Sequence, residues 1–152
     1  MCTYDKQLAE VAAFEAAYYD DELQPPCTIA EIKELQERTK LLLGAELPKE
    51  YEQFLLKHNG LDFNGMVIYA GTKKPSEGDD DYCILDFVEA NLIRRDIEEM
   101  NDFLLIGEKD DEEFGLQVSS SKYVQIDATC LDVIEEYSSF DEMIAEVIQS
   151  RL

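Results

Sequence analysis

The sequence predicts a single α+β domain in which a mixed or antiparallel sheet packs against helices from both ends of the chain. The chain has 152 residues, about the length of one domain. Apolar residues recur with the period of a helix near both ends, whereas several segments of the second half have the short apolar or alternating pattern of strands. Hydrophobic residues make up 45% of the chain, so a core can form despite the high charge.

Residues 4–20 are rich in alanine and are predicted to form the first helix. Asp20 and Asp21 follow at the negative end of the helix dipole, and Pro25-Pro26 then imposes an extended connector. The domain is predicted to comprise residues 1–152, and this connector allows residues 1–24 to be attached loosely. The mostly apolar stripe of the helix contains Leu8, Val11, Ala12, Glu15, Tyr18 and Tyr19.

Thr28 and Glu31 have the spacing of a capping box, which predicts a second helix from about Ile29. Gly44 is expected to end this helix, because glycine readily adopts the left-handed conformation that closes a helix. The buried face is expected to contain Ile32, Leu35, Leu42 and Leu43.

The stretch from Leu47 to Gly65 predicts a third helix and a turn. Pro48 suits the first helical position, and Asn59-Gly60 is expected to end the helix. Asn64-Gly65 predicts a turn before a strand at 66–70. The face that enters the core is expected to contain Leu47, Tyr51, Phe54 and Leu55.

The remaining elements are predicted from apolar runs, capping residues and turn residues. An exposed loop is expected after Gly71, followed by an extended segment at 82–85 and a helix that Asp86 caps and that reaches Ile97. The apolar run 103–107 is typical of a central strand, and 113–118 with 122–127 is typical of a hairpin. An edge segment is predicted at 132–137. The final helix is expected to start after Ser139 and to bury Phe140, Met143, Ile144, Val147 and Ile148.

The pattern Leu-Pro-x-x-Tyr-x-x-Phe-Leu from Leu47 to Leu55, followed by Asn59-Gly60, resembles the SUKH superfamily. The resemblance extends approximately from Ile29 to the C-terminus. It implies an α+β domain related to a yeast cell-wall regulator, and a binding protein. Many bacterial members are immunity proteins that neutralise toxins, often nucleases, whereas other members act as adaptors.

The charge of the chain restricts its partners. Asp and Glu number 35 against 13 Lys and Arg, which gives a formal net charge of −22. Phosphate groups are held by Lys and Arg, so this balance argues against binding to nucleic acid or to an anionic membrane. A basic protein is the complementary partner. The alternative explanation is that the acidic residues only keep the protein in solution.

No catalytic residue, metal ligand or cofactor is predicted. The chain has one histidine, His58, which is expected to be a capping or surface residue. Four widely spaced cysteines form no Cys-x-x-Cys pair, and buried, reduced thiols are expected. The sequence also has no signal peptide and no apolar run of membrane-spanning length, which predicts a cytoplasmic protein.

Two acidic clusters, 77–81 and 108–113, fall in predicted loops, where carboxylates can reach a basic cleft on a partner. Tyrosines near these clusters are candidate anchors, because tyrosine is frequent at interface hot spots. The alternatives are that the carboxylates only solvate the loops and that the tyrosines belong to the core. The predicted partner-binding residues are Asp79, Asp80, Asp81, Tyr82, Asp110, Asp111, Glu112, Tyr69 and Tyr123.

The predicted function is that of a non-catalytic immunity protein. It would bind a cognate bacterial toxin, such as a basic nuclease, and occlude the toxin's active cleft. The resemblance supplies the class of function, and the charge supplies the nature of the partner. The alternative is an intracellular adaptor or regulatory module that recruits a housekeeping protein.

Overall fold

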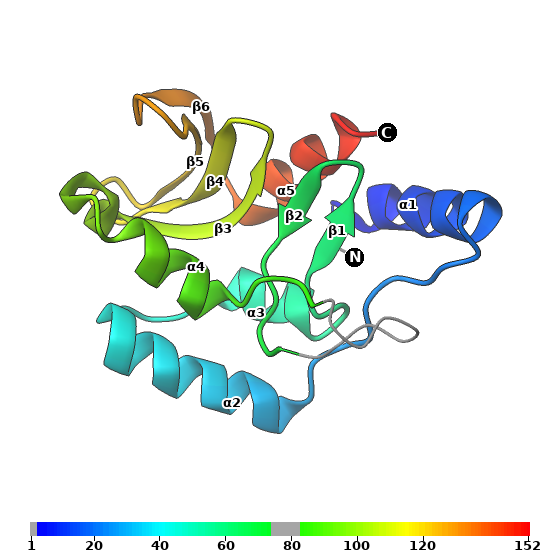
Figure 1. Cartoon of the computed structure of the whole chain (residues 1–152), viewed down its shortest axis with the longest axis horizontal. Helices are drawn as coiled ribbons and strands as arrows, with labels where there is room; N and C mark the ends of the chain where they lie inside the picture. Colours follow the sequence, from blue (N-terminus) through cyan, green and yellow to red (C-terminus); the bar gives the residue numbers. More distant parts are fainter. Residues whose placement is uncertain (1–2, 74–82) are drawn as a thin grey trace.

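The computed structural model describes residues 3–73 and 83–152 and shows a single α+β domain (Figure 1). Within these residues, helices pack against a six-stranded sheet. The α-helices are α1 (Asp5–Tyr18), α2 (Ile29–Arg38), α3 (Lys49–Leu55), α4 (Phe87–Arg94) and α5 (Phe140–Gln149), with a π-helical turn η1 (Thr39–Leu43) and a 3₁₀-helix η2 (Glu98–Asp102). The strands are β1 (Leu61–Phe63), β2 (Met66–Ile68), β3 (Phe103–Lys109), β4 (Glu112–Gln117), β5 (Lys122–Asp127) and β6 (Val133–Tyr137).

The sheet is antiparallel throughout, and its spatial order follows the sequence from β1 to β6. This confirms the α+β class and resolves the predicted choice between a mixed and an antiparallel sheet. β3 lies inside the sheet, as its apolar run predicted, and β6 lies at one edge. The predicted hairpin of 113–118 and 122–127 is present as β4 and β5.

The turn at Asn64-Gly65 is confirmed, but β1 before it was not predicted. Asn64 and Gly65 have φ values of 50° and 83°, as the tightest two-residue hairpin turns require. The turn pairs Leu61 with Ile68 and Phe63 with Met66. β1 has three residues and forms by pairing with β2, so its own sequence gives little signal.

The third helix is shorter than predicted. It ends at Leu55, and Pro48 is the residue that precedes its first turn. Gly60 does not close the helix; it has a φ of 85° and lies so close to β2 that an added Cβ would meet the Ile68 carbonyl oxygen at 2.8 Å. The glycine is therefore needed for a close backbone approach, not as a helix cap.

The second helix has the predicted start and end, and three of the four residues expected on its buried face, Ile32, Leu35 and Leu43, are buried. Thr28 and Glu31 form the capping box, and Gly44 ends the helical segment with a φ of 65°. The last turn is η1, whose wider π-helical geometry changes the direction of its side chains. Thr39 and Leu43 are buried as a result, whereas Leu42 is 48% exposed and its predicted place in the core was wrong.

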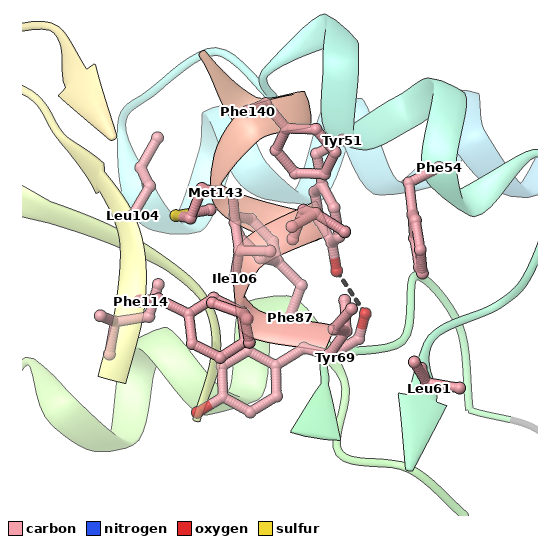
Figure 2. Close-up of a cluster of buried hydrophobic side chains, with 14 of the residues drawn as sticks. Tyr51, Phe54, Leu61, Tyr69, Phe87, Leu104, Ile106, Phe114, Phe140 and Met143 are labelled. Atoms are coloured by element: carbon pink, nitrogen blue, oxygen red, sulfur yellow. Dashed lines mark hydrogen bonds between the residues drawn. The ribbon is translucent and has the colours of Figure 1, made fainter. Parts of the chain in front are cut away.

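The core joins the sheet to α3, α4 and α5 (Figure 2). Leu104 and Ile106 of β3 face the α5 side chains of Phe140 and Met143, and all four are buried. The Tyr51 hydroxyl donates a hydrogen bond of 2.5 Å to the Tyr69 carbonyl oxygen. The predicted inward faces of α3 and α5 are therefore confirmed.

The helices nearest the two ends of the chain are in contact, because α1 packs against α5. Tyr4 is fully buried, and its ring meets Phe54 edge-on at 5.7 Å and Phe140 at 6.1 Å. The other end of α1 extends away from the sheet (Figure 1). Tyr18 and Tyr19 there are 72% and 67% exposed, so the predicted stripe reaches the core only at Leu8 and Val11 among the described helical residues.

α4 lies beside the part of β3 that β2 does not pair with, because β2 pairs only with Gly107 to Lys109. Asp86 caps this helix by accepting from the backbone N–H groups of Val88 and Glu89, as predicted, but the helix ends at Arg94 instead of Ile97. The Asn91 side chain donates to the Leu105 carbonyl oxygen at 2.9 Å and accepts from the Leu105 N–H at 2.8 Å. A side-chain amide thus supplies the two bonds that a neighbouring strand would make.

The second acidic cluster, 108–113, was predicted to lie in a loop, and only Asp110 and Asp111 do so. Glu108 and Glu113 belong to β3 and β4, which pair directly with each other. The turn between these strands is formed by Asp110 and Asp111, and Asp110 has a φ of 50°. The strands extend further than the apolar pattern indicated because the acidic residues continue the ladder.

Candidate protein-binding surface

The predicted partner-binding residues lie in three different environments. Asp79, Asp80, Asp81 and Tyr82 are outside the described residues. Tyr69 and Tyr123 are buried, with 2% and 9% of their surfaces exposed, which matches the alternative that these tyrosines belong to the core. Asp110, Asp111 and Glu112 lie at the tip of the β3–β4 hairpin.

The two buried tyrosines take part in polar contacts at the edge of the core. The Tyr69 hydroxyl donates to Glu108 at 3.3 Å. Burial, together with Glu108, raises the pKa of the Tyr69 phenol, and burial with Glu50 raises that of Tyr123. Both phenols therefore remain neutral and donate hydrogen bonds, and neither ring is available to a partner in this conformation.

The tip of the β3–β4 hairpin is held by the end of α5. The Arg151 guanidinium contacts the exposed carboxylate of Asp110 at 2.5 Å. The backbone carbonyl oxygen of Arg151 accepts a hydrogen bond of 3.0 Å from the Asn64 side chain. Glu112 accepts a hydrogen bond from Gln125. Asp110 and Asp111 are exposed and Glu112 is partly exposed, so this tip presents three carboxylates to solvent, two of them, those of Asp110 and Glu112, held by neighbouring side chains.

Two other carboxylates are committed to the interior of the protein. The Glu113 carboxylate accepts hydrogen bonds from two nitrogens of Arg94, the shortest of 2.7 Å, and Glu113 is only 3% exposed. Burial raises the pKa of the Glu113 carboxyl, and Arg94 opposes this rise. Asp86 is paired in the same way with Arg38. These two carboxylates stabilise the fold and are not part of a contact surface.

Asn59, from the Asn-Gly of the predicted signature, anchors the chain ahead of the first acidic cluster. Its Oδ1 accepts from the Gly71 and Thr72 N–H groups at 2.8 and 3.2 Å, and its side-chain nitrogen donates to the Thr72 carbonyl oxygen. The Cys27 thiol donates to the same Oδ1. Asn59 is 2% exposed, so it fixes the backbone that leads into residues 74–82 without facing a partner itself.

His58 lies in an open groove of about 510 Å³ beside α1. Its Nδ1 is 2.8 Å from the Gln24 carbonyl oxygen, which ties it to the connector after α1. Lys57, next to it, forms an ion pair with Asp5 at 2.8 Å. His58 is half-buried and follows the end of α3. Its side chain bonds to the connector and not to a helix end, so the expected capping role is wrong, whereas its place in this open groove agrees with the expected surface position. The groove is lined by Asp5, Leu8, Ala9, Ala12, Ala16, Asp21, Glu22, Leu23, Lys57 and His58.

The cysteines of the described residues differ in their surroundings. Cys27 is buried and Cys83 is half-buried, whereas Cys130 is exposed, which corrects the expectation of buried thiols. Residues 3–73 and 83–152 contain no group of three or more His, Cys, Asp or Glu side chains placed to hold a metal ion. In the same residues, no helix has the length and apolarity needed to cross a membrane.

An exposed aromatic cluster at the end of α1 was not predicted. The Phe14 ring centroid lies 4.7 Å from that of Tyr18, 6.0 Å from that of Tyr19 and 5.6 Å from that of Phe63. The helical period placed Tyr18 on the stripe of Val11, but the helix reaches beyond the core before that position. The available signal was the two aspartates that follow the adjacent pair of tyrosines, because negative charge is unfavourable at the C-terminal end of a helix.

Comparison with known proteins gives one family match. The model of the SMI1 / KNR4 family (SUKH-1) matches residues 26–146, which include the whole sheet and helices α2 to α4. A comparison with curated proteins found no match. The matched range begins after α1 and reaches into α5.

Proposed function

Because the chain belongs to the SMI1 / KNR4 family (SUKH-1), a family of immunity-like proteins, we propose that it is an immunity protein that neutralises a cognate bacterial toxin. It binds the toxin and blocks the toxin's active cleft. The family is generally non-catalytic, and the proposal therefore requires a stable docking surface and no reaction. The protein acts in the cytoplasm, where a toxin that enters the cell meets its target.

The observation that supports a basic partner is the net charge of −22. A surface with this charge attracts a basic protein and raises its association rate by a factor of about 10–10³ over a neutral surface. Nuclease clefts are basic because they hold phosphate groups. We therefore propose a nuclease as the toxin, with the acidic surface of this chain in the place of the nucleic acid.

The proposed contact residues are Asp79, Asp80, Asp81 and Tyr82, together with Asp110, Asp111 and Glu112. The hairpin tip supports this proposal because the carboxylates of Asp110 and Glu112 are held in place by Arg151 and Gln125. Fixed carboxylates lose little conformational freedom when a partner binds, which favours affinity. The first group follows Gly71 and Thr72, whose backbone Asn59 holds.

The test begins with capture of the partner from a lysate of the native host, using the purified chain at low and at high salt. A basic protein that the chain retains at low salt and retains less strongly at high salt is then expressed alone and together with this chain. We expect expression alone to stop growth and co-expression to restore it. For a nuclease, addition of this chain should also inhibit cleavage of nucleic acid in stoichiometric amounts.

Two outcomes would reject the proposal. A captured protein that is harmless when expressed alone would indicate the adaptor function instead. A toxic protein whose activity persists in the presence of saturating chain would show that binding does not neutralise it. A neighbouring gene for a large toxin would supply a specific candidate for the same assays.

A further inference from the structure

The far end of α1 carries aromatic side chains that the core does not use. Phe14, Tyr18 and Tyr19 are 39%, 72% and 67% exposed, and their rings contact one another through Phe14. Phe14 also meets the β1 residue Phe63 edge-on, so the cluster is supported by the sheet. Exposed aromatic residues gathered in one place are more typical of a binding surface than single exposed apolar residues are.

A small cavity lies beside these rings. Asp20 has a φ of 50°, which turns the chain at the end of α1, and the Asp21 N–H then donates to the Glu15 carbonyl oxygen at 3.2 Å. This turn brings the Asp21 residue back toward Glu15. The resulting cavity has a volume of about 270 Å³ and is lined by Phe14, Glu15, Tyr19, Asp21, Phe63 and Asn64. We call these six residues the α1 pocket.

The electrostatics of the α1 pocket favour a cation. Its lining contains two carboxylates, Glu15 and Asp21, and no Lys or Arg among the described residues. Burial raises the pKa of the Glu15 carboxyl, and the negative charges of Asp21 and Asp62 add to the rise. Arg151, whose carbonyl accepts from Asn64, has its guanidinium paired with Asp110.

This arrangement is unfavourable for the free protein. Asp20 and Asp21 place negative charge at the negative end of the α1 dipole, and two tyrosines expose their rings. Local features that oppose stability are concentrated at functional sites, where the rest of the fold compensates for their cost. A positive group in the α1 pocket would relieve the repulsion between the carboxylates and cover the rings at the same time.

We propose that the α1 pocket receives an arginine side chain from a basic protein partner. The planar guanidinium stacks flat on an aromatic face and donates two parallel hydrogen bonds to a carboxylate. A lysine ammonium can also lie over a ring, but it acts as a point charge without the flat stacking or the two parallel bonds. The volume lies below the range of about 300–1,000 Å³ that is usual for small-molecule sites, so it suits a single side chain. The inference rests on the proposed function in one respect, the basic character of the partner.

The position of the pocket suggests what it contributes. α1 lies before residues 26–146, the range that matches the family, whereas Phe63 and Asn64 lie within it. The pocket thus combines an element outside the matched domain with the β1–β2 turn of that domain. It would help to select the partner of this chain, while the matched domain supplies the common framework.

The direct test uses capped tri-arginine and tri-lysine peptides as probes for the full chain. Two-dimensional ¹H–¹⁵N NMR spectra are recorded as each peptide is added. We expect tri-arginine to shift the amide signals of residues 14–21 and 62–64 first, with a dissociation constant about five-fold lower than that of tri-lysine. Shifts spread evenly over the acidic surface, or equal affinity for the two peptides, would overturn the inference.

Matched variants make the test specific. Tyr19→Ala, and separately Glu15→Gln with Asp21→Asn, should each raise the tri-arginine dissociation constant by about five-fold. Leu41→Ala is the control for loss of an exposed apolar side chain, because Leu41 is 82% exposed on η1. Glu98→Gln with Glu99→Gln is the control for loss of two exposed charges. If the controls weaken binding as much as the pocket variants do, the inference is wrong.

The same variants separate this inference from the proposed function. If a toxin is captured and neutralised equally well by the unmodified chain and by the Tyr19 variant, the immunity function stands and the α1 pocket is not part of its interface. If tri-arginine binds the pocket selectively but no toxin is captured, the pocket stands and the immunity function is rejected.

Discussion

Arg38 holds the carboxylate of Asp86 with two nitrogens, at 3.0 and 3.1 Å, and so connects α2 to the first turn of α4. The same carboxylate caps α4 through Val88 and Glu89. The hydrogen bonds to Asp86 raise the pKa of the Arg38 guanidinium, which stays charged throughout the accessible pH range. One buried carboxylate therefore fixes the relative position of two helices.

Replacing Asp86 by alanine should lower the free energy of unfolding by about 2–3 kcal/mol, because it removes a helix cap and leaves Arg38 without its partner. Arg38 is one-third exposed, so solvent compensates for part of the loss. Asp86→Asn, which keeps an acceptor for the cap, should cost less. Urea denaturation of both variants measures the difference, and equal losses would show that the cap contributes nothing.

Phe54→Ala should destabilise the protein by about 3–5 kcal/mol, because it leaves a cavity where α3 meets α1 and α5. Phe54 is fully buried and its ring contacts Tyr4 and Phe140. Leu41→Ala on the surface is the control and should change the free energy of unfolding by less than about 0.5 kcal/mol. An unchanged thermal melt for Phe54→Ala would contradict the packing described for α3.

Glu15→Gln should stabilise the protein at neutral pH. Since burial and the neighbouring acidic residues raise the pKa of Glu15 in the folded state, its contribution is present below its ordinary pKa and is lost as the pH rises through the folded value. The gain in melting temperature over the unmodified chain should therefore grow as the pH rises from the ordinary pKa of a glutamate carboxyl through the raised folded value. Glu10→Gln, on an exposed position of α1, controls for the lower net charge. Equal gains for both variants would refute the local origin of the effect.

Replacing Asp79, Asp80 and Asp81 by lysine should slow association with the captured toxin and weaken its dependence on salt. The control replaces the exposed Asp96, Glu98 and Glu99 by lysine and changes the net charge by the same amount. Association rates are measured by stopped-flow fluorescence at several salt concentrations. If the two triple variants slow association equally, the net charge and not the 79–81 segment steers the toxin.

The parts of the fold that were predicted correctly depend on residues close together in sequence. The capping box of Thr28 and Glu31, the cap at Asp86 and the turn at Asn64-Gly65 each involve two to four neighbouring residues. Ser139 also caps α5 as predicted, although Glu142 accepts from the N–H of Ser138 and not of Ser139. Local chemistry of this kind can be recognised without knowing the rest of the structure.

The errors arise where distant segments decide the outcome. β1 exists because β2 pairs with it, and Gly60 is required by the nearby carbonyl of Ile68. Tyr18 has the spacing of a core residue, but α1 extends past the core before it is reached. These features depend on the length of one element relative to another, which periodicity does not report.

The acidic character of the candidate site follows from the sequence, but which of its residues are exposed does not. The sequence shows how many carboxylates are present, whereas ion pairs across long sequence separations decide which of them reach solvent. The buried Glu113 forms an ion pair with Arg94, whereas Asp111 remains exposed. For the same reason the pattern could not distinguish the buried Tyr69 from the exposed Tyr19.

Each strand from β2 onward pairs with the strand that precedes it along the chain, and β3 to β6 follow one another without an intervening helix. Such an arrangement closes mostly short loops, which favours rapid folding. Strands β3 to β6 can assemble in the order in which the ribosome releases them. A newly made copy would then reach its folded form quickly, as the proposed immunity function requires of a protein that must be present before the toxin arrives.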